Sequence, residues 1–199
     1  MLTVYAGCMF ASKTTSLIAE AQIALEENKS VLLLKPSIDS RYGESDIKTH
    51  DGLSATELGL TPFLIPTDWE IDKKIFLHNS ETSKIDLVCI DEVQFLKNAD
   101  LIVKEFLSKG IDVVCAGLDL DSFGNSFGKM GELLCLADII QKCVASCAVC
   151  GETATRTFRK LSADQSQVVV VGGSNMFEPR CYKHWEEGRI ESAKWLVSY

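Results

Sequence analysis

Four short segments of the chain are apolar at nearly every position. They cover residues 2–6, 31–34, 85–90 and 111–118. A strand that is buried on both faces has this continuous pattern, whereas a strand with one exposed face alternates. Between these segments, residues 17–25 and 99–107 carry apolar side chains at helical spacing. The alternation predicts an α/β fold in which helices cover both faces of a parallel sheet, with ligands bound at the carboxyl ends of its strands.

The pattern changes from about Lys142 onward. This part contains paired cysteines, a polar stretch, a strand-like run over residues 167–171 and a glycine turn at Gly172 and Gly173. We therefore predict a main α/β domain over residues 1–140 and a small second lobe over residues 141–199.

Charge and composition exclude several classes of protein. The chain of 199 residues has a formal net charge of −8 and a pI near 4.9, so it lacks the clustered Lys and Arg of a nucleic-acid binder. No apolar run reaches the roughly 20 residues that span a bilayer, and the N-terminus does not follow signal-peptide order. Eight cysteines are spaced more like reduced thiols and metal ligands than like a disulfide framework. We expect an unsecreted, cytoplasmic protein that binds neither nucleic acid nor membrane.

The loop after the first strand resembles a phosphate-binding loop. Its residues are Gly7, Cys8, Met9, Phe10, Ala11, Ser12, Lys13, Thr14 and Thr15. They match the pattern G-x-x-x-x-G-K-[ST], except that Ser12 replaces the second glycine. In such loops the backbone N–H groups and the helix N-terminus hold phosphates, the lysine binds the β- and γ-phosphates, and the hydroxyl of the next residue binds Mg²⁺. The main domain is thus predicted to be a P-loop NTPase domain that binds ATP, with Lys13 and Thr14 in the last two roles.

Two acidic residues, Asp91 and Glu92, follow the third apolar segment. At the end of a parallel strand they would face the phosphates. Asp91 can help to bind Mg²⁺, and Glu92 can accept the proton of an attacking hydroxyl group. A solvated strand end is the alternative interpretation, and the phosphate loop favours function.

Four residues of the second lobe have the spacing of a zinc ribbon. They are Cys147, Cys150, Cys181 and His184. Each pair has two intervening residues and brings two ligands to one side of a turn, so two pairs complete a closed tetrahedron. A closed Zn²⁺ site leaves no position for a catalytic water, which predicts a structural metal. Unligated buried thiols are the alternative.

The order of these motifs resembles the thymidine kinase family that eukaryotes, bacteria and large DNA viruses share. The resemblance covers nearly the whole chain. Besides the phosphate loop, the shared motifs are Asp39-Ser40-Arg41-Tyr42, Thr49-His50-Asp51 and Asp91-Glu92-Val93-Gln94-Phe95. Residues 168–177 resemble the family's lasso loop, which closes over the nucleoside.

The resemblance implies a chemistry and a set of roles. The γ-phosphate of ATP would pass to the 5′-hydroxyl of thymidine, with Glu92 as the base, Arg41 against the transferring phosphoryl group and Asp39 near the Mg²⁺. It also implies a homotetramer or homodimer. The implied thymidine-binding residues are Met9, Gln94, Phe95, Leu118, Phe123, Phe127, Thr157, Val171, Gly172, Gly173 and Phe177. Core packing explains Phe123 and Phe127 equally well.

Ser12 leaves a second function open. Its side chain could weaken phosphate binding, and the chain would then be a nucleotide-binding protein of the same fold with weakened or lost kinase activity. Lys13, Thr14, Asp91 and Glu92 are all present, which favours the enzyme.

Overall fold

A computed structural model describes residues 1–37, 55–71, 85–160 and 172–197 of the chain. Its centre is a six-stranded sheet in the order β3-β2-β4-β5-β1-β6, in which every pair of neighbouring strands is parallel. The strands are β1 (Leu2–Gly7), β2 (Val31–Pro36), β3 (Phe63–Ile65), β4 (Leu87–Ile90), β5 (Asp112–Gly117) and β6 (Ile139–Cys143). The predicted α/β fold class is confirmed.

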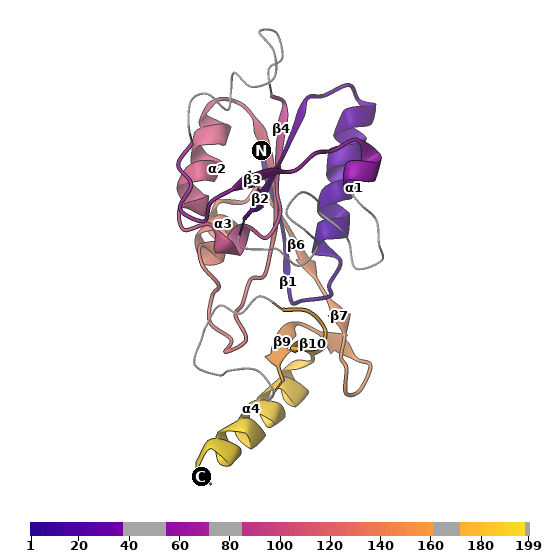
Figure 1. Ribbon diagram of the computed structural model, residues 1–199, viewed down its shortest axis with the longest axis vertical. Coiled ribbons are helices and arrows are strands. Elements are labelled where there is room, and N and C mark those ends of the chain that lie inside the picture. The colour runs from indigo at the N-terminus through magenta and orange to yellow at the C-terminus, as the bar shows by residue number, and fades with distance from the viewer. Residues whose placement is uncertain (38–54, 72–84, 161–171, 198–199) are drawn as a thin grey trace.

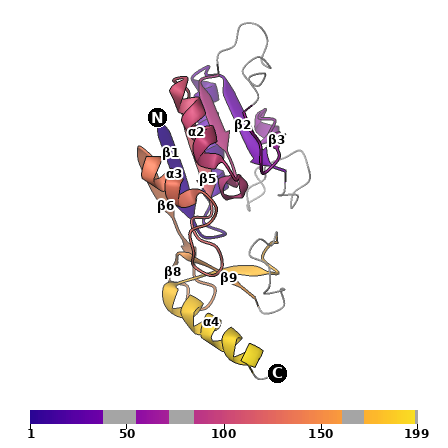
Figure 2. The same ribbon diagram turned by 90° about the vertical axis from the view of Figure 1, so that its left-hand side faces the viewer.

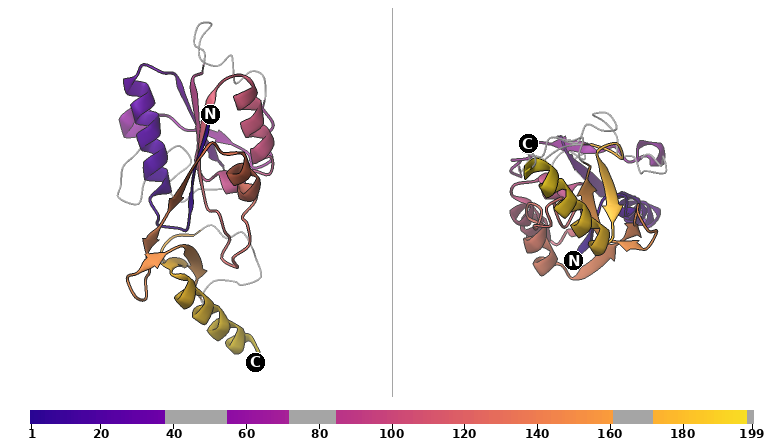
Figure 3. Two further views of the ribbon diagram at one scale, coloured as in Figure 1. Left: turned by 180° about the vertical axis from the view of Figure 1, so that it is seen from behind. Right: turned by 90° about the horizontal axis from the view of Figure 1, so that it is seen from below.

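Helices cover both faces of this sheet (Figure 1). Helix α1 (Lys13–Glu26) lies on one face, and α2 (Ala99–Ser108) and α3 (Met130–Leu136) lie on the other, as the view from behind also shows (Figure 3). The buried side chains accordingly form two clusters. One packs α1 against the sheet through Leu17 and Ile18, and the other packs α2 through Val103 and Phe106. The four strands and both helices expected from the apolar pattern are present.

Strands β3 and β6 were not expected from the sequence. They are the two edge strands of the sheet. Strand β6 pairs with β1 over its full length, from Ile139 opposite Thr3 to Cys143 opposite Gly7, and so runs across the predicted boundary between residues 140 and 141. The carbonyl oxygen of Cys143 lies so close to Gly7 that a Cβ atom at that position would overlap it. The first glycine of the phosphate loop is therefore required by the neighbouring strand.

The second lobe lies beyond the carboxyl ends of the sheet strands (Figures 1 and 2). It contains two antiparallel pairs and a helix that projects away from the sheet. Their elements are β7 (Ala145–Ser146), β8 (Thr153–Ala154), β9 (Arg156–Arg159), β10 (Phe177–Arg180) and α4 (Tyr182–Val197). Short 3-10 helices, η1 (Thr56–Leu58) and η3 (Val93–Phe95), complete the assigned elements.

Among the helices of the described residues, none has the length and apolar character that crossing a membrane requires.

Candidate active site

The phosphate loop connects β1 directly to α1. Gly7 ends the strand and Lys13 begins the helix, so the first turn of α1 opens at the carboxyl edge of the sheet. The helix N-terminus presents N–H groups and a positive dipole there, as an anion site requires. The sequence motif and its expected structural context therefore occur together.

Ser12 adopts a left-handed backbone conformation, with φ 53° and ψ 27°. Phe10 is also left-handed, with φ 65°. A non-glycine residue in this conformation costs roughly 1–2 kcal/mol, because its Cβ crowds the following carbonyl group. Ser12 is the N-cap residue of α1, but its side chain makes no capping hydrogen bond. Its carbonyl oxygen accepts the first hydrogen bond of the helix, from Ser16 N at 3.1 Å. The loop therefore keeps the glycine geometry with a serine in place.

Lys13 folds over the phosphate loop. Its Nζ donates to the carbonyl oxygen of Cys8 at 2.6 Å. Burial lowers the pKa of the Lys13 ammonium, and the negative charge of Glu92 is the main influence that opposes this shift, with smaller contributions from Cys8 and Asp91. The lysine thus contacts the loop through Cys8, and the charges of the acidic pair that follows β4 favour its protonated form.

Thr14 and Asp91 are in direct contact. The Oγ1 of Thr14 lies 3.1 Å from Oδ1 and 3.3 Å from Oδ2 of Asp91, and the Asp91 side chain is buried. A hydroxyl and a carboxylate at the end of a phosphate loop are hard oxygen ligands, which Mg²⁺ prefers. Two of the three predicted Mg²⁺ residues, Thr14 and Asp91, thus lie together although they are 77 positions apart in the chain, and they fit the ion. The third, Asp39, lies outside the described residues.

Glu92 follows directly and also has a left-handed backbone, with φ 50°. Its Oε2 accepts a hydrogen bond of 2.6 Å from Nε2 of Gln94. Gln94 in turn accepts from the N–H of Leu118 through Oε1, at 3.1 Å. Three residues assigned to the site from sequence are thus linked in one chain of hydrogen bonds.

Two of the predicted aromatic residues contact each other. The rings of Phe95 and Phe127 meet edge to face, with centroids 5.6 Å apart. Phe123 is half-buried, and its N–H donates to Oδ1 of Asp121 at 2.9 Å. Both the nucleoside and the core interpretations of Phe123 and Phe127 remain compatible with this arrangement.

The second lobe brings Thr157 to the phosphate loop. The Oγ1 of Thr157 accepts from the N–H of Met9 at 3.0 Å, so two predicted thymidine-binding residues touch. The Sγ of Cys8 lies 3.4 Å from the carbonyl oxygen of Ala154, which extends the contact.

Only part of the predicted lasso loop lies in the described residues. Its end leads into β10, where Phe177 is buried and pairs with Arg159 of β9. Gly172 and Gly173 are half-buried, and the carbonyl oxygen of Gly173 accepts from Phe177 N at 3.0 Å. Asp39, Arg41 and Val171 lie outside the described residues, as does the motif at residues 49–51.

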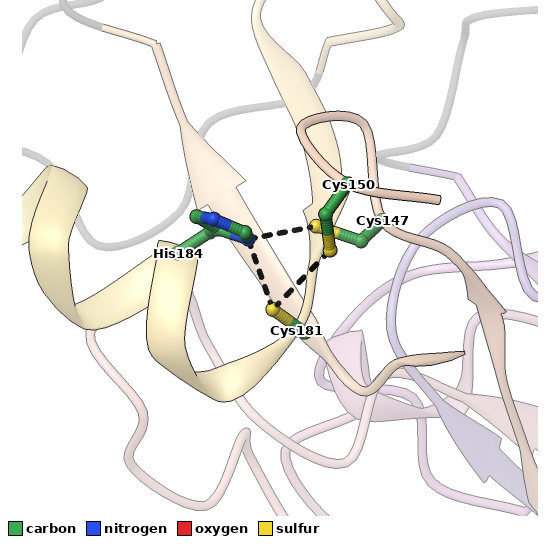
Figure 4. Close-up of side chains that lie close together, drawn as sticks. All are labelled: Cys147, Cys150, Cys181 and His184. Carbon is green, nitrogen blue, oxygen red and sulfur yellow. Dashed lines mark hydrogen bonds between the residues drawn. The ribbon is translucent and has the colours of Figure 1, made fainter. Parts of the chain in front are cut away.

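The Cys and His residues predicted to bind zinc converge in the second lobe (Figure 4). Their ligand atoms all lie within 4.8 Å of one another. His184 Nδ1 is 3.1 Å from Cys181 Sγ and 3.6 Å from Cys147 Sγ, and the Sγ atoms of Cys150 and Cys181 are 4.0 Å apart. In a tetrahedral Zn²⁺ site the ligand atoms lie about 3.5–3.8 Å apart. The four residues are therefore compatible with zinc.

Local polar groups favour the metal-binding form of Cys147. Burial alone would raise the pKa of this thiol, but backbone N–H groups around Cys181, Cys150 and Val149, together with the His184 ring, lower it to about 6. A thiolate is the form that binds Zn²⁺, so the donor chemistry also fits the metal.

Trp185 is a residue of this region that sequence reasoning missed. It is buried, and its Nε1 donates to the carbonyl oxygen of Ser122 at 3.2 Å. Its ring packs against Gly124, so it joins α4 to the loop after β5. A tryptophan directly after His184, the predicted zinc ligand, was the available signal.

A phosphate loop at the carboxyl edge of a parallel sheet, with an acidic pair at the end of β4, defines a P-loop nucleotide-binding protein. The family model described as thymidine kinase matches residues 1–185. The chain belongs to the thymidine kinase family.

The chain is also similar to two proteins that are named thymidine kinase. The chain is 38% identical to a protein named thymidine kinase from Onion yellows phytoplasma (strain OY-M), and the match covers 97% of this chain and 90% of the relative. The protein of the same name from Aster yellows witches'-broom phytoplasma (strain AYWB) is also 38% identical, with the same coverage. The resemblance drawn from the motifs is confirmed.

Proposed function

We propose that the protein is an ATP:thymidine 5′-phosphotransferase. The observation that carries this proposal is the contact between Thr14 Oγ1 and Asp91 at 3.1 Å, which completes the metal side of a phosphate loop in a chain of the thymidine kinase family. The names of the two relatives, each aligned over 97% of this chain, support thymidine as the acceptor.

The transfer needs a base near the acceptor hydroxyl. Glu92 takes the proton of the thymidine 5′-hydroxyl as its oxygen bonds to the γ-phosphorus, and ADP leaves as the bond between the β–γ bridging oxygen and that phosphorus breaks. The N–H groups of residues 8–15 hold the phosphates, and Lys13 leaves its contact with Cys8 to bind them. Bound Mg²⁺, held through Thr14 and Asp91, supplies charge neutralisation at the phosphate oxygens.

The remaining roles follow the family pattern. Arg41 steadies the transferring phosphoryl group, and Asp39 acts near the metal. The nucleoside lies between the aromatic residues of the main domain and the lasso loop, where Val171, Gly172 and Gly173 bind the base and Phe177 supports the loop from β10. Their placement in a bound complex is part of the proposal.

Zn²⁺ has a structural role in this proposal. The two short strand pairs of the second lobe bury few large apolar side chains in the described part of the chain, and a closed metal site supplies folding free energy in place of a large core. Zinc would hold β7, β10 and α4 together and so set the position of the lasso loop.

The assembly and location also belong to the proposal. A homodimer or homotetramer fits the outer strand β6, where Ile139 and Ile140 are exposed, because apolar edge strands are usually covered by a partner. A cytoplasmic location, where thiols stay reduced, fits the eight free cysteines.

The direct test is transfer of labelled γ-phosphate from ATP to thymidine by the purified protein. We expect labelled thymidine monophosphate to form only with Mg²⁺ present. Tight nucleotide binding without transfer would instead support the nucleotide-binding protein with lost activity, which nothing in the comparisons favours.

A further inference from the structure

The side chain of Gln94 occupies an enclosed position beside the proposed base. It belongs to η3, and only 3% of the residue surface is exposed. Its Nε2 donates to Oε2 of Glu92 at 2.6 Å, and its Oε1 accepts from Leu118 N at 3.1 Å. The short distance is typical of a hydrogen bond to an ionised carboxylate.

The direction of the Gln94 amide is determined by its partners. A backbone N–H can only donate, so the N–H of Leu118 must face the amide oxygen. The NH₂ group then points to Glu92, where a carboxylate can only accept. The two contacts agree on one orientation, and reversing the amide would oppose donor to donor and acceptor to acceptor.

The backbone at Gly117 lies close to the Gln94 amide. A Cβ at Gly117 would lie 2.6 Å from Oε1 of Gln94 and 3.0 Å from the Met130 sulfur. A glycine at the end of β5 therefore makes space for the amide, and the sulfur of the fully buried Met130 lies close to the same position. The Gln94 side chain sits in a slot formed by β5 and α3.

Glu92 depends on this slot for its direction. Its left-handed backbone, with φ 50° and ψ 39°, turns the chain sharply at the end of β4. A non-glycine residue keeps this strained conformation only when its surroundings hold it. The side chain of Glu92 is half-buried. Gln94 links its carboxylate to the backbone N–H of Leu118, which directly follows the buried strand β5.

We propose that Gln94 is a positioning residue, which holds the Glu92 carboxylate against the acceptor hydroxyl, in place of the thymine contact expected from the family resemblance. The inference rests on the proposed function, because it needs Glu92 as the base. It also explains why both polar groups of a buried glutamine are directed at protein atoms: the amide transmits the position of β5 to the carboxylate.

A kinetic double-mutant cycle tests this role. Gln94→Met keeps the length of the side chain and removes both polar groups. We expect kcat to fall by about 10- to 100-fold, because a misplacement of roughly 1 Å can cost that much, while the KM values for thymidine and ATP change less than about threefold. In a Glu92→Gln background the same substitution should lower kcat by less than about twofold, since the base is already absent.

Two further variants separate positioning from folding. Leu96→Ala removes a fully buried side chain at the end of the same 3-10 helix, and we expect it to lower the melting temperature with kcat retained. Gln94→Asn keeps the amide but shortens its reach by one methylene, so it should reproduce the kcat loss, and it serves in place of Gln94→Met if that variant does not fold.

Three outcomes would overturn the inference. A large rise in the KM for thymidine with kcat intact would make Gln94 a thymine contact. An equal loss of kcat in both backgrounds would make its effect independent of Glu92. Wild-type turnover in Glu92→Gln alone would remove the base from the proposed function and the positioning role with it, whereas a failed Gln94 cycle with an inactive Glu92→Gln leaves the proposed function standing.

Discussion

The N–H of Met9 donates a hydrogen bond of 3.0 Å to Oγ1 of Thr157 and so joins the phosphate loop to strand β9 of the second lobe. Thr157 is buried, with 4% of its surface exposed. A hydrogen bond in such a place is costly to break on one side only, because the remaining polar group stays buried without its partner. This buried hydrogen bond therefore joins the phosphate loop to the second lobe, which carries the predicted lasso loop.

Thr157→Val tests this connection. Valine keeps the shape and removes the acceptor, so we expect a loss of about 1–3 kcal/mol in the free energy of unfolding. For a chain of this length each kcal/mol lowers the melting temperature by about 2–4 °C, which calorimetry or circular dichroism would detect.

Thr157→Ser is the matched control for the valine variant. It keeps the hydroxyl and removes the methyl group, so stability should be closer to wild type. If the methyl group contacts the 5-methyl of thymine, as the family resemblance implies, the serine variant should also prefer thymidine over deoxyuridine less strongly. Equal melting temperatures for wild type and Thr157→Val would contradict the structural role of the bond.

Metal content is the second prediction. We expect one Zn²⁺ per chain in freshly purified protein, because four ligand atoms lie within 4.8 Å of one another and Cys₃His sets bind Zn²⁺ as closed structural sites. Cys181→Ser should lose the metal and weaken thymidine binding more than ATP binding, since it loosens the lobe and leaves the phosphate loop in place.

Cys135→Ser is the control for the metal ligand. Cys135 is exposed on α3 and lies outside the cluster, so its substitution should leave both zinc content and thymidine binding at wild-type levels. Elemental analysis that finds no stoichiometric metal in wild-type protein would refute the zinc assignment.

Removal of the proposed base is the third prediction. Glu92→Gln keeps the size of the side chain and removes the proton acceptor, so kcat should fall by roughly 10²-fold or more with little change in ATP affinity. Steady-state kinetics together with equilibrium titration of ATP would separate the two effects. Turnover near the wild-type value would show that another group accepts the proton.

The sequence predicted those parts of the fold that depend on local pattern. Strand β4 is buried at every position, so its residues are apolar throughout and easily recognised. Edge strand β6 is different, because Ile139, Ile140 and Gln141 are all exposed, and such a strand has no continuous apolar signal. Strand β6 was missed for this reason, whereas β3 was missed because it has only three residues.

In the candidate site too, features with a local sequence pattern could be predicted and contacts between distant residues could not. The convergence of the four predicted zinc ligands could be predicted because each pair is separated by two residues, a spacing that brings both side chains to one side of a turn. The contact between Met9 and Thr157 joins residues 148 positions apart, and no local pattern records such a pairing. The hydrogen bond from the Leu118 N–H to Gln94 was not predicted, because the motif names Gln94 without this distant partner.

The last prediction concerns Ser12, which has a left-handed backbone in the phosphate loop. With φ 53° and an exposed side chain that makes no capping bond, serine gains nothing in the described loop to offset its conformational cost. Glycine has no Cβ to crowd the neighbouring carbonyl group, so Ser12→Gly should raise the free energy of unfolding by about 1 kcal/mol after its larger entropy loss is included.

Ser12→Gly should also lower the KM for ATP by about fivefold, which corresponds to about 1 kcal/mol, because the backbone can approach the phosphates more closely. The KM for thymidine should change little, and Ser16→Gly, one turn further along α1, should lower stability without improving the KM for ATP. Thermal unfolding and steady-state kinetics on the three proteins test both effects. Activity that appears only in Ser12→Gly would mean that the natural serine has inactivated the enzyme, and an unchanged melting temperature would show that the left-handed turn carries no strain.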